Sequence, residues 1–485
     1  MEDGGVYPER NTDMPIGPDE KPSANKTAIL AIILISYVMI VLDISIVLTG
    51  LPRIHAELGF SDAGLAWVST AYTLTFGGCL LLGGRAGDIF GRRRMFLVGL
   101  TIFSLASLVI GVSQTPAVMI AARALQGLGS AILAPSTLAL LQTNFEPGPE
   151  RTRAVSYYAA AAGVSAAFGL VVGGLLADWL SWRVGFFINL PIGIAMMIAA
   201  KCYVCETERT SGTFDIAGAI ISTLGIVALV YGVIRSASTG WADLETQACV
   251  GFGIAMLILF GFVELRASQP IMPLSLFADR ERSAAYGARA LFLGANVGFY
   301  FFVAQFLQSV VGLSSSEAGI AFLPTTVVNF IIAMSAPRLI GRFGAGSVLV
   351  TSVVTGLIGM IWLSFAMQQA SLAVLIIPMM LIGAGQGGAL GPLTASGIVR
   401  VPSERAGAAS GVVNVAHQLG SSLGLGVLVS VAAIGSQGLQ GTALLARRAS
   451  VAMETGSVLV AMTLILAVMF MARPRARLEN ASTTA

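Results

Sequence analysis

The sequence contains unusually few charged residues. Charged residues make up 11% of its 485 residues, and 55% of the residues are hydrophobic. A soluble protein carries about a quarter charged residues, so this composition excludes a water-soluble enzyme. Aliphatic residues are abundant, which also excludes an intrinsically disordered chain. The net charge of +3 gives no basic field for nucleic acid, and no nucleic-acid partner is expected.

Cysteine and histidine are scarce as well. Four cysteines are too few for a disulfide framework, and the CxxC formed by Cys202 and Cys205 has no histidine or second CxxC nearby. The two histidines, His55 and His417, lie far apart, which leaves catalytic metal sites and Ser/His/Asp triads without support. The chain has no Walker lysine motif, and its Gly-rich run at 383–388 follows no predicted strand. We therefore expect no enzyme activity, no metal and no cofactor.

Long apolar runs are what the chain has instead. A run of about 17–25 residues is long enough for a helix to cross the hydrocarbon core of a bilayer. We count fourteen such runs, at residues 28–50, 65–83, 95–112, 117–141, 154–177, 184–204, 215–235, 247–265, 286–308, 318–337, 347–366, 372–396, 406–431 and 454–472. The predicted fold class is an all-α integral membrane protein with 14 transmembrane helices, whose first partner is the lipid bilayer.

Lysine and arginine are distributed unevenly between alternate loops. If the N-terminus is cytoplasmic, 21 of the 28 basic residues lie in cytoplasmic segments and 5 in outer segments. The other two, Arg123 and Arg289, lie inside predicted helices. Positive charge collects on the cytoplasmic side of membrane proteins, so we expect both termini in the cytoplasm. The polar leader has no cleavage-like AxA site, which predicts an uncleaved first helix.

Two pairs of similar segments indicate an internal repeat in the sequence. The loop at 84–94 has a degenerate partner at 337–344, at an offset of 253 residues, and glycines of the fifth run match glycines of the thirteenth at an offset of 257. Carriers that work by alternating access are built from such repeats. We expect a polar cytoplasmic tail at 1–27, six-helix bundles at 28–205 and 286–472, a linker with two extra helices at 206–285, and a cytoplasmic tail at 473–485.

Two opposite charges lie inside predicted helices at matching depth. Asp43 is roughly 10 Å and Arg123 roughly 9 Å from the outer end of its run, at 1.5 Å per residue. A charge inside a membrane helix is expensive and marks a functional site by default. We interpret the pair as a proton switch, in which protonation releases Asp43; a purely structural ion pair is the alternative. Arg289, in the first turn of its predicted helix, is expected to snorkel to the cytoplasmic surface.

The loop after the second run combines glycines, arginines and an acid. Asp88 can cap a helix N-terminus, the glycines permit close helix approach, and the arginines anchor the cytoplasmic face. The partner loop has Gly341 in place of this acid, so we expect Asp88 to supply most of the state-specific polar contacts at that face. An ordinary positive-inside loop is the alternative. The gating residues are Gly84, Asp88, Gly91, Arg92 and Arg93.

These patterns resemble those of a known family. The loop at 84–94 is similar to the cytoplasmic signature of the major facilitator superfamily, with Ala86 and Gly87 in place of Leu and Ala. The segments at 42–52, 123–129 and 182–193 resemble further motifs of its fourteen-helix drug:proton antiporter family. The resemblance covers about residues 28–472. It implies two six-helix halves with a two-helix insert, and it associates Arg123 with proton movement driven by a proton gradient, without a cofactor.

The chain departs from the family pattern at three places. Leu48 replaces an asparagine of the first helix, and Leu170 replaces the proline that bends the fifth helix in the antiporter motif. His417 stands where relatives often have arginine; it either titrates or is a packed neutral residue. The glycines of the fifth-helix motif are present as Gly169, Gly173 and Gly174.

Polar residues are sparse within the apolar runs. Asn296 and Asn329 fall near the bilayer midplane by helical rise, which favours a large, mostly apolar cavity for bulky hydrophobic ligands. Hydrogen bonds between helices are the alternative role for each amide. The run at 318–337 has no acid, whereas some members of the resembled family that export multivalent organic cations have one there, and this weakens an assignment to dicationic drugs. The expected cavity residues are Tyr72, Gln126, Asn296, Tyr300, Gln305, Asn329 and Gln386.

The expected function is proton-coupled secondary active export of hydrophobic drugs or small-molecule metabolites by alternating access. This implies multidrug efflux and antibiotic resistance, with the chain in a bacterial plasma (inner) membrane. The alternatives are a major-facilitator carrier of lipids, siderophores or other metabolites, with or without protons, and a transport-inactive membrane sensor. The expected partners are protons and a hydrophobic substrate, and a periplasmic adaptor protein is a further candidate.

Overall fold

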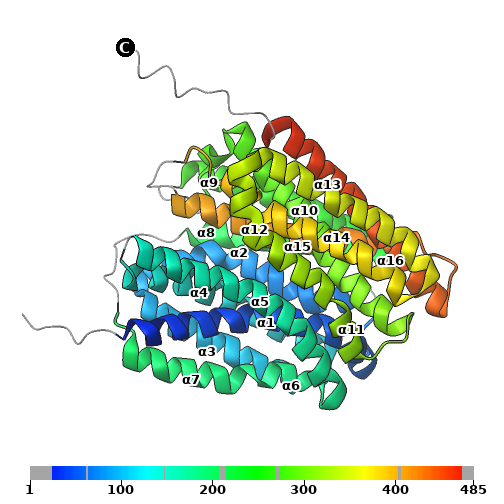
Figure 1. The fold of residues 1–485 in the computed structure, drawn as a ribbon, viewed down its shortest axis with the longest axis horizontal. Coiled ribbons are helices and arrows are strands. Elements are labelled where there is room, and N and C mark those ends of the chain that lie inside the picture. Colours follow the sequence, from blue (N-terminus) through cyan, green and yellow to red (C-terminus); the bar gives the residue numbers. More distant parts are fainter. Residues whose placement is uncertain are drawn as a thin grey trace, which may run out of the picture.

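The computed structural model describes residues 25–471, except 62–63, 147, 207–214, 268–269, 271 and 402–405. Within these residues the regular secondary structure is helical (Figure 1). The helices are α1 (Lys26–Leu58), α2 (Trp67–Phe90), α3 (Arg92–Gly111), α4 (Pro116–Asn144), α5 (Pro149–Trp179), α6 (Trp182–Phe187), α7 (Asn189–Tyr203), α8 (Ile216–Thr239), α9 (Leu244–Arg266), α10 (Arg280–Ser309), α11 (Ser315–Ala321), α12 (Leu323–Phe343), α13 (Ala345–Ala366), α14 (Leu372–Gly397), α15 (Ala406–Ile434) and α16 (Gly441–Leu466).

The predicted all-α membrane class is confirmed, but the count of fourteen spans is not. Thirteen stretches of the described chain are long and apolar enough to cross a membrane. The fifth predicted run lies in α5, which has 31 residues, and within the described part of this helix Phe168–Trp179 is a shorter apolar stretch. Each of the runs at 184–204 and 318–337 is broken into two helices, α6–α7 and α11–α12.

Capping side chains fix several helix starts, some of them outside the apolar runs. Asp279 accepts the backbone N–H of Arg282 and starts α10 six residues before the predicted run. Ser314 and Glu317 form a capping box that starts α11. Such caps satisfy backbone N–H groups that the first helical turn leaves unpaired. These polar caps lie outside the apolar runs, so a hydropathy pattern does not detect them. The helices therefore begin earlier than the sequence predicted.

The helices lie in two layers (Figure 1). In the lower layer α1 packs on α5, and α4 packs on α2 and α3. In the upper layer α10 packs on α15 and α16, and α14 packs on α12 and α13. Helix α8, which packs on α9, lies beside α2 and α15, and these two helices pack together and join the two layers.

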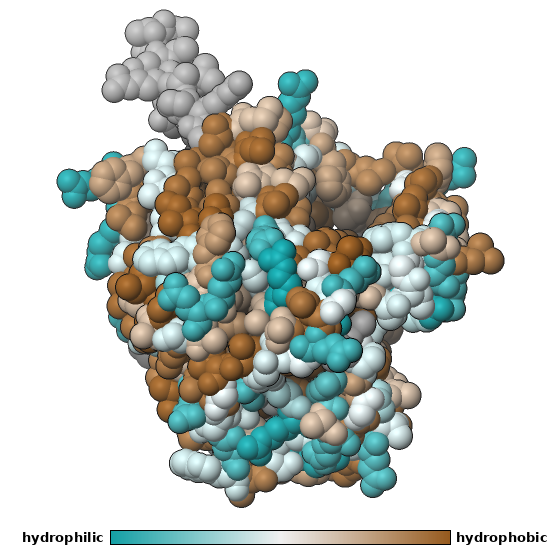
Figure 2. All heavy atoms as spheres, turned by 90° about the vertical axis from the view of Figure 1, so that its right-hand side faces the viewer, coloured by the Kyte–Doolittle hydropathy of each residue, from teal (hydrophilic) through white to brown (hydrophobic). Residues whose placement is uncertain are grey.

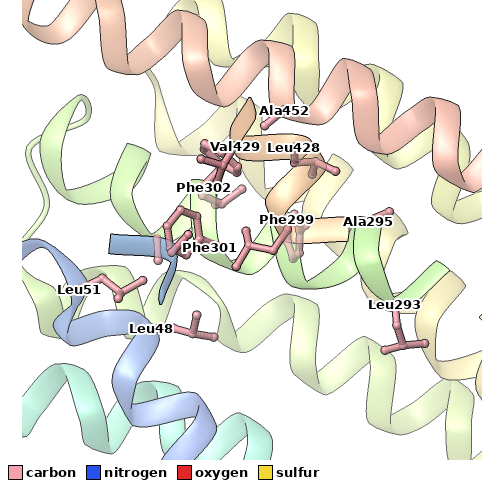
Figure 3. Close-up of a cluster of buried hydrophobic side chains, with 14 of the residues drawn as sticks. Leu48, Leu51, Leu293, Ala295, Phe299, Phe301, Phe302, Leu428, Val429 and Ala452 are labelled. Carbon is pink, nitrogen blue, oxygen red and sulfur yellow. The ribbon is translucent and has the colours of Figure 1, made fainter. Parts of the chain in front are cut away.

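The two ends of the molecule differ in how the layers meet. We call the end where α1 begins and α16 finishes the tail end, and the end where α1 finishes and α11 begins the far end. Figure 2 looks onto the far end, where hydrophilic side chains are spread among hydrophobic ones. Near this end, Leu48 and Leu51 of α1 and the phenylalanines Phe299 and Phe301 of α10 belong to one buried cluster (Figure 3).

The first part of α1 belongs to a different core. Ile29, Ile33 and Ile40 are buried in a separate cluster with Phe96 and Leu100 of α3, all within the lower layer. The layers therefore share a hydrophobic core at the far end, where α5 also packs against α11. Toward the tail end the core of the lower layer is its own. This arrangement describes a molecule closed at the far end.

Candidate functional site

Asp43 of α1 and Arg123 of α4 form a buried ion pair. The Arg123 Nη1 atom lies 2.6 Å from Asp43 Oδ2, and both side chains are 1% exposed. The pairing predicted from their matched depth is confirmed. Burying a charge without a partner is costly, so each residue makes the other tolerable in the interior.

Two amides hold the second carboxylate oxygen. Gln126 and Asn189 each donate to Asp43 Oδ1 over 2.9 Å, and both also donate to Ser107 Oγ. Arg123 in turn donates to Gln126 Oε1 and to the carbonyl of Val68. The α1 carboxylate thus accepts from α4 and α7, and Ser107 of α3 links the two amides. Hydrogen bonds to an ionised acceptor are the strong ones, so the network is built around a charged Asp43.

Tyr72 and Gln126 were expected in the substrate cavity, but the structure places both in this network. The Tyr72 ring lies over the Arg123 guanidinium at 4.4 Å, and its hydroxyl pairs with Ser130 at 2.8 Å. Both side chains are fully buried. The sequence reasoning missed Ser107 altogether and quoted Asn189 only as part of a motif. The signal that could have found Asn189 is its isolated polar side chain in the apolar run at 184–204.

The glycines of the fifth-helix motif face two different neighbours. A Cβ at Gly173 would lie 2.6 Å from the Ile46 Cα, and one at Gly169 would lie 2.6 Å from the Ser45 Cβ. Both glycines therefore let α5 approach α1 next to Asp43. A Cβ at Gly174 would collide with the backbone of Ser315 in α11. The motif is thus a contact surface, and its part in proton coupling stays a prediction.

A polar cluster joins the layers at the far end, and the sequence did not reveal it. Asp178 of α5 accepts the backbone N–H groups of Ser315 (3.1 Å) and Ser316 (2.7 Å), together with the Ser316 hydroxyl. Arg53 of α1 donates to the same carboxylate at 2.7 Å. We call these four residues the far-end lock. The hydrogen bond from Gln308 to the Thr49 carbonyl, at 3.1 Å, lies beside it.

The loop at 84–94 is held by contacts within the lower layer. Arg92 donates to Asp88 at 3.1 Å and to the Ala139 carbonyl at 3.2 Å. Asp88 lies inside α2, so it does not cap α3 as expected. Glu206 does so instead, because it accepts the backbone N–H groups of Arg93 and Arg94. The loop turns at Gly91, whose φ of 102° favours glycine.

Three of the expected cavity residues meet in the upper layer. Tyr300 of α10 and Asn329 of α12 both donate to Gln386 Oε1 of α14, at 3.2 and 3.1 Å. All three side chains are only partly buried. Asn296 and Gln305 stay outside this cluster, since each bonds to a carbonyl of its own helix. Gln305 instead lines a cavity of about 240 Å³ near the far end.

Arg289 does not snorkel as expected. Its side chain is buried, and it donates to Thr394 Oγ1 at 2.7 Å and to His417 Nδ1 at 3.2 Å. The expectation failed because α10 begins at Arg280, which places Arg289 in its third turn and not its first.

Among the described residues no three His, Cys, Asp or Glu side chains gather as metal ligands.

The long apolar helices and the ion pair buried among them identify a multi-pass helical membrane protein. The family model described as Major Facilitator Superfamily matches residues 33–425. The chain belongs to this superfamily.

The sequence is similar to exporters and resistance proteins. It is 36% identical over 429 residues to the cephamycin export protein CmcT of Amycolatopsis lactamdurans, covering 86% of this chain and 88% of that protein. It is 37% identical over 410 residues to the puromycin resistance protein pur8 of Streptomyces alboniger, covering 83% and 81%. Among solved structures, a bacterial homologue of the lysosomal transporter Spinster, inward-facing and occupied, has a TM-score of 0.63 at 16% identity, covering 93% and 97%. This last likeness shows the fold alone.

Proposed function

We propose that this protein exports hydrophobic drugs or metabolites in exchange for protons, by alternating access. The observation that carries the proposal is the buried Asp43–Arg123 pair, in a chain similar to proteins named for export and resistance. Protonation of Asp43 removes its attraction for Arg123 and frees the amides of Gln126 and Asn189. A single proton thus changes the contacts between α1, α4 and α7, which is what a coupled carrier needs.

The proposed topology has fourteen spans, with α5 as the fourteenth. Its 31 residues extend about 46 Å at 1.5 Å per residue, enough to cross a bilayer. The bias of lysine and arginine supports a cytoplasmic tail end, and the proposed location is a bacterial plasma membrane. Bundles at 28–205 and 286–472 then flank the α8–α9 insert. In this orientation the far-end lock closes the outer side, and the described conformation faces inward.

The Tyr300–Asn329–Gln386 cluster is the proposed polar part of the substrate site. It joins three helices of the upper layer, and its members are partly accessible. A cavity with few polar groups selects ligands by shape and apolar area. This fits bulky hydrophobic substrates.

The proposal is tested by transport into inverted membrane vesicles. Puromycin and a panel of hydrophobic dyes are offered with and without an imposed gradient, acid inside, using vesicles that lack the protein as the control. We expect uptake several-fold above the control that needs the gradient and disappears when an ionophore collapses it. Uptake that is equal with and without the gradient would contradict proton coupling. An absence of uptake for every compound would contradict export.

Asp88→Asn tests the loop at 84–94. The Asp88–Arg92 pair is partly exposed, so its loss will change stability by less than about 1 kcal/mol. We nevertheless expect slower transport, because the loop is proposed to favour the conformation closed at the cytoplasmic face. An introduced cavity cysteine should label faster from that side. A wild-type rate with unchanged labelling would reduce the loop to a topological anchor.

A further inference from the structure

Arg289 carries a positive charge into the upper layer without meeting an acid. The residue is 8% exposed, and the two terminal nitrogens of its guanidinium bond to Thr394 and His417, which are both neutral acceptors. Its Nε is buried without a hydrogen-bond partner. Arg289 takes part in none of the ion pairs between described residues whose geometry the structure gives.

The contrast with Arg123 is direct. Arg123 is also buried, but it is paired with Asp43, and its Nε donates to the Val68 carbonyl over 2.8 Å. Buried charges are normally paired, because an uncompensated one is costly. The lower layer therefore contains its own counter-charge. In the upper layer Arg289 has no such partner among the described ion pairs.

The nearest acids on α10 are already engaged. Asp279 and Glu281 both accept hydrogen bonds from Arg400, at 2.9 and 2.8 Å. Burial works to raise the pKa of Asp279, but the backbone N–H of Arg282 and the Arg400 guanidinium hold that pKa below its usual range. Glu281 also precedes Arg289 by about 12 Å along the helix. Neither carboxylate is placed to neutralise Arg289.

Arg289 also lies in line with the proposed substrate site. Asn296 and Tyr300 follow it by seven and eleven residues, spacings that return to the same helix face. The distance along α10 from Arg289 to Tyr300 is about 16 Å. Asn296 Oδ1, between them, is buried without a partner. A polar row thus leads from the unpaired cation to the Tyr300–Asn329–Gln386 cluster.

We propose that Arg289, oriented by Thr394 and His417, binds a carboxylate of the transported substrate, whose apolar body extends along α10 toward Tyr300. Arginine presents parallel N–H groups that match a carboxylate, and Nε belongs to one such edge. His417 accepts from Arg289 through Nδ1, so its Nε2 carries a hydrogen that adds a second donor. This inference rests on the proposed export function and adds that the substrates include anionic amphiphiles.

The test is equilibrium binding to the purified full-length chain in phosphatidylcholine nanodiscs. The probes are 1-pyrenebutyrate and its methyl ester, which differ only in charge. We expect the carboxylate to bind about tenfold more tightly than the ester. Arg289→Gln should remove that preference and leave ester binding within about twofold. No saturable carboxylate binding, no preference in the wild type, or a preference that survives Arg289→Gln would overturn the proposal.

A second pair of variants keeps the test decisive if Arg289→Gln does not fold. Thr394→Val removes the hydroxyl that holds Arg289 and should weaken carboxylate binding about threefold. Thr355→Val, in α13, removes a hydroxyl that bonds only within its own helix, and serves as the control. Equal carboxylate affinity in the two threonine variants would count against the proposal.

Two further measurements distinguish this inference from the proposed function and from binding of a lipid headgroup. Binding is measured without a proton gradient, so a chain that binds the carboxylate but transports nothing contradicts the proposed function alone. A chain that exports neutral compounds without preferring the carboxylate contradicts this inference alone. We expect the same affinity in nanodiscs containing phosphatidylglycerol. A tenfold loss there would assign the site to a lipid headgroup and overturn the substrate assignment.

Discussion

Asp43→Asn will abolish proton-coupled efflux while leaving a folded protein in the membrane. Asparagine has nearly the same shape as aspartate, and its carbonyl oxygen can still accept from Arg123. It cannot take up or release a proton, so the contacts between α1, α4 and α7 no longer depend on the gradient. Removing one charge of a buried ion pair costs about 3–5 kcal/mol, so the amount of folded protein is measured together with transport. We expect the gradient-driven rate to fall to that of vesicles without the protein.

The measurement is gradient-driven uptake into inverted vesicles, with the amount of folded protein checked by size-exclusion chromatography. Asp243→Asn is the matched control, because Asp243 is a half-buried acid in the turn between α8 and α9. It should transport like the wild type. Uphill export at the wild-type rate by folded Asp43→Asn would end the proton-switch interpretation.

Asp178→Asn will open the far end. The carboxylate accepts hydrogen bonds from Ser315, Ser316 and Arg53, so it ties α5 both to α11 and to α1. Charged hydrogen bonds are worth about 1–3 kcal/mol, and those to Ser315 and Ser316 of α11 exist only when the layers meet at this end. Removing the charge should therefore move the population by about 5- to 150-fold toward the far-end-open state. Turnover should slow, because the inward-facing state becomes rare.

The effect is measured at Leu51, which is buried in the cluster shared by α1 and α10 (Figure 3). A cysteine placed there, in a background without the native cysteines, should react at least about tenfold faster with an impermeant maleimide when Asp178→Asn is present. Glu57→Gln is the control. Glu57 lies at the same end, but its partners Trp182 and Arg183 belong to the lower layer. Labelling that Asp178→Asn leaves unchanged would show that the lock does not hold the layers together.

The sequence predicted best what depends on one helix at a time. Each apolar run overlaps a helix because lipid requires about 20 apolar residues per crossing. The Asp43–Arg123 pair was found because helical rise converts position into depth. The error over Arg289 has the same origin, since a start misplaced by six residues shifts the depth by about 9 Å.

What depends on how helices face each other was not predictable. Ser107 and Asn189 are small polar residues in apolar runs, and nothing in their spacing pointed to Asp43. Asp178 lay just past the end of a predicted run, and its partners in α11 are about 140 residues further along the chain. Those contacts form only where the two layers close in one conformation, and a hydropathy pattern is the same in every conformation.

The position of Asp43 between two cores gives α1 a mechanical role. Residues before it, from Ile29 to Ile40, are embedded with α3 in the lower layer, and residues after it, from Val47 to Leu58, lie in the cluster that α10 shares with lower-layer helices. In the proposed alternating-access cycle, movement of the upper layer acts on the second part of α1, while the first part stays packed on α3. We infer that α1 then bends or twists at the level of Asp43 and shifts its carboxylate relative to Arg123. This would link the motion of the layers directly to the protonation of Asp43.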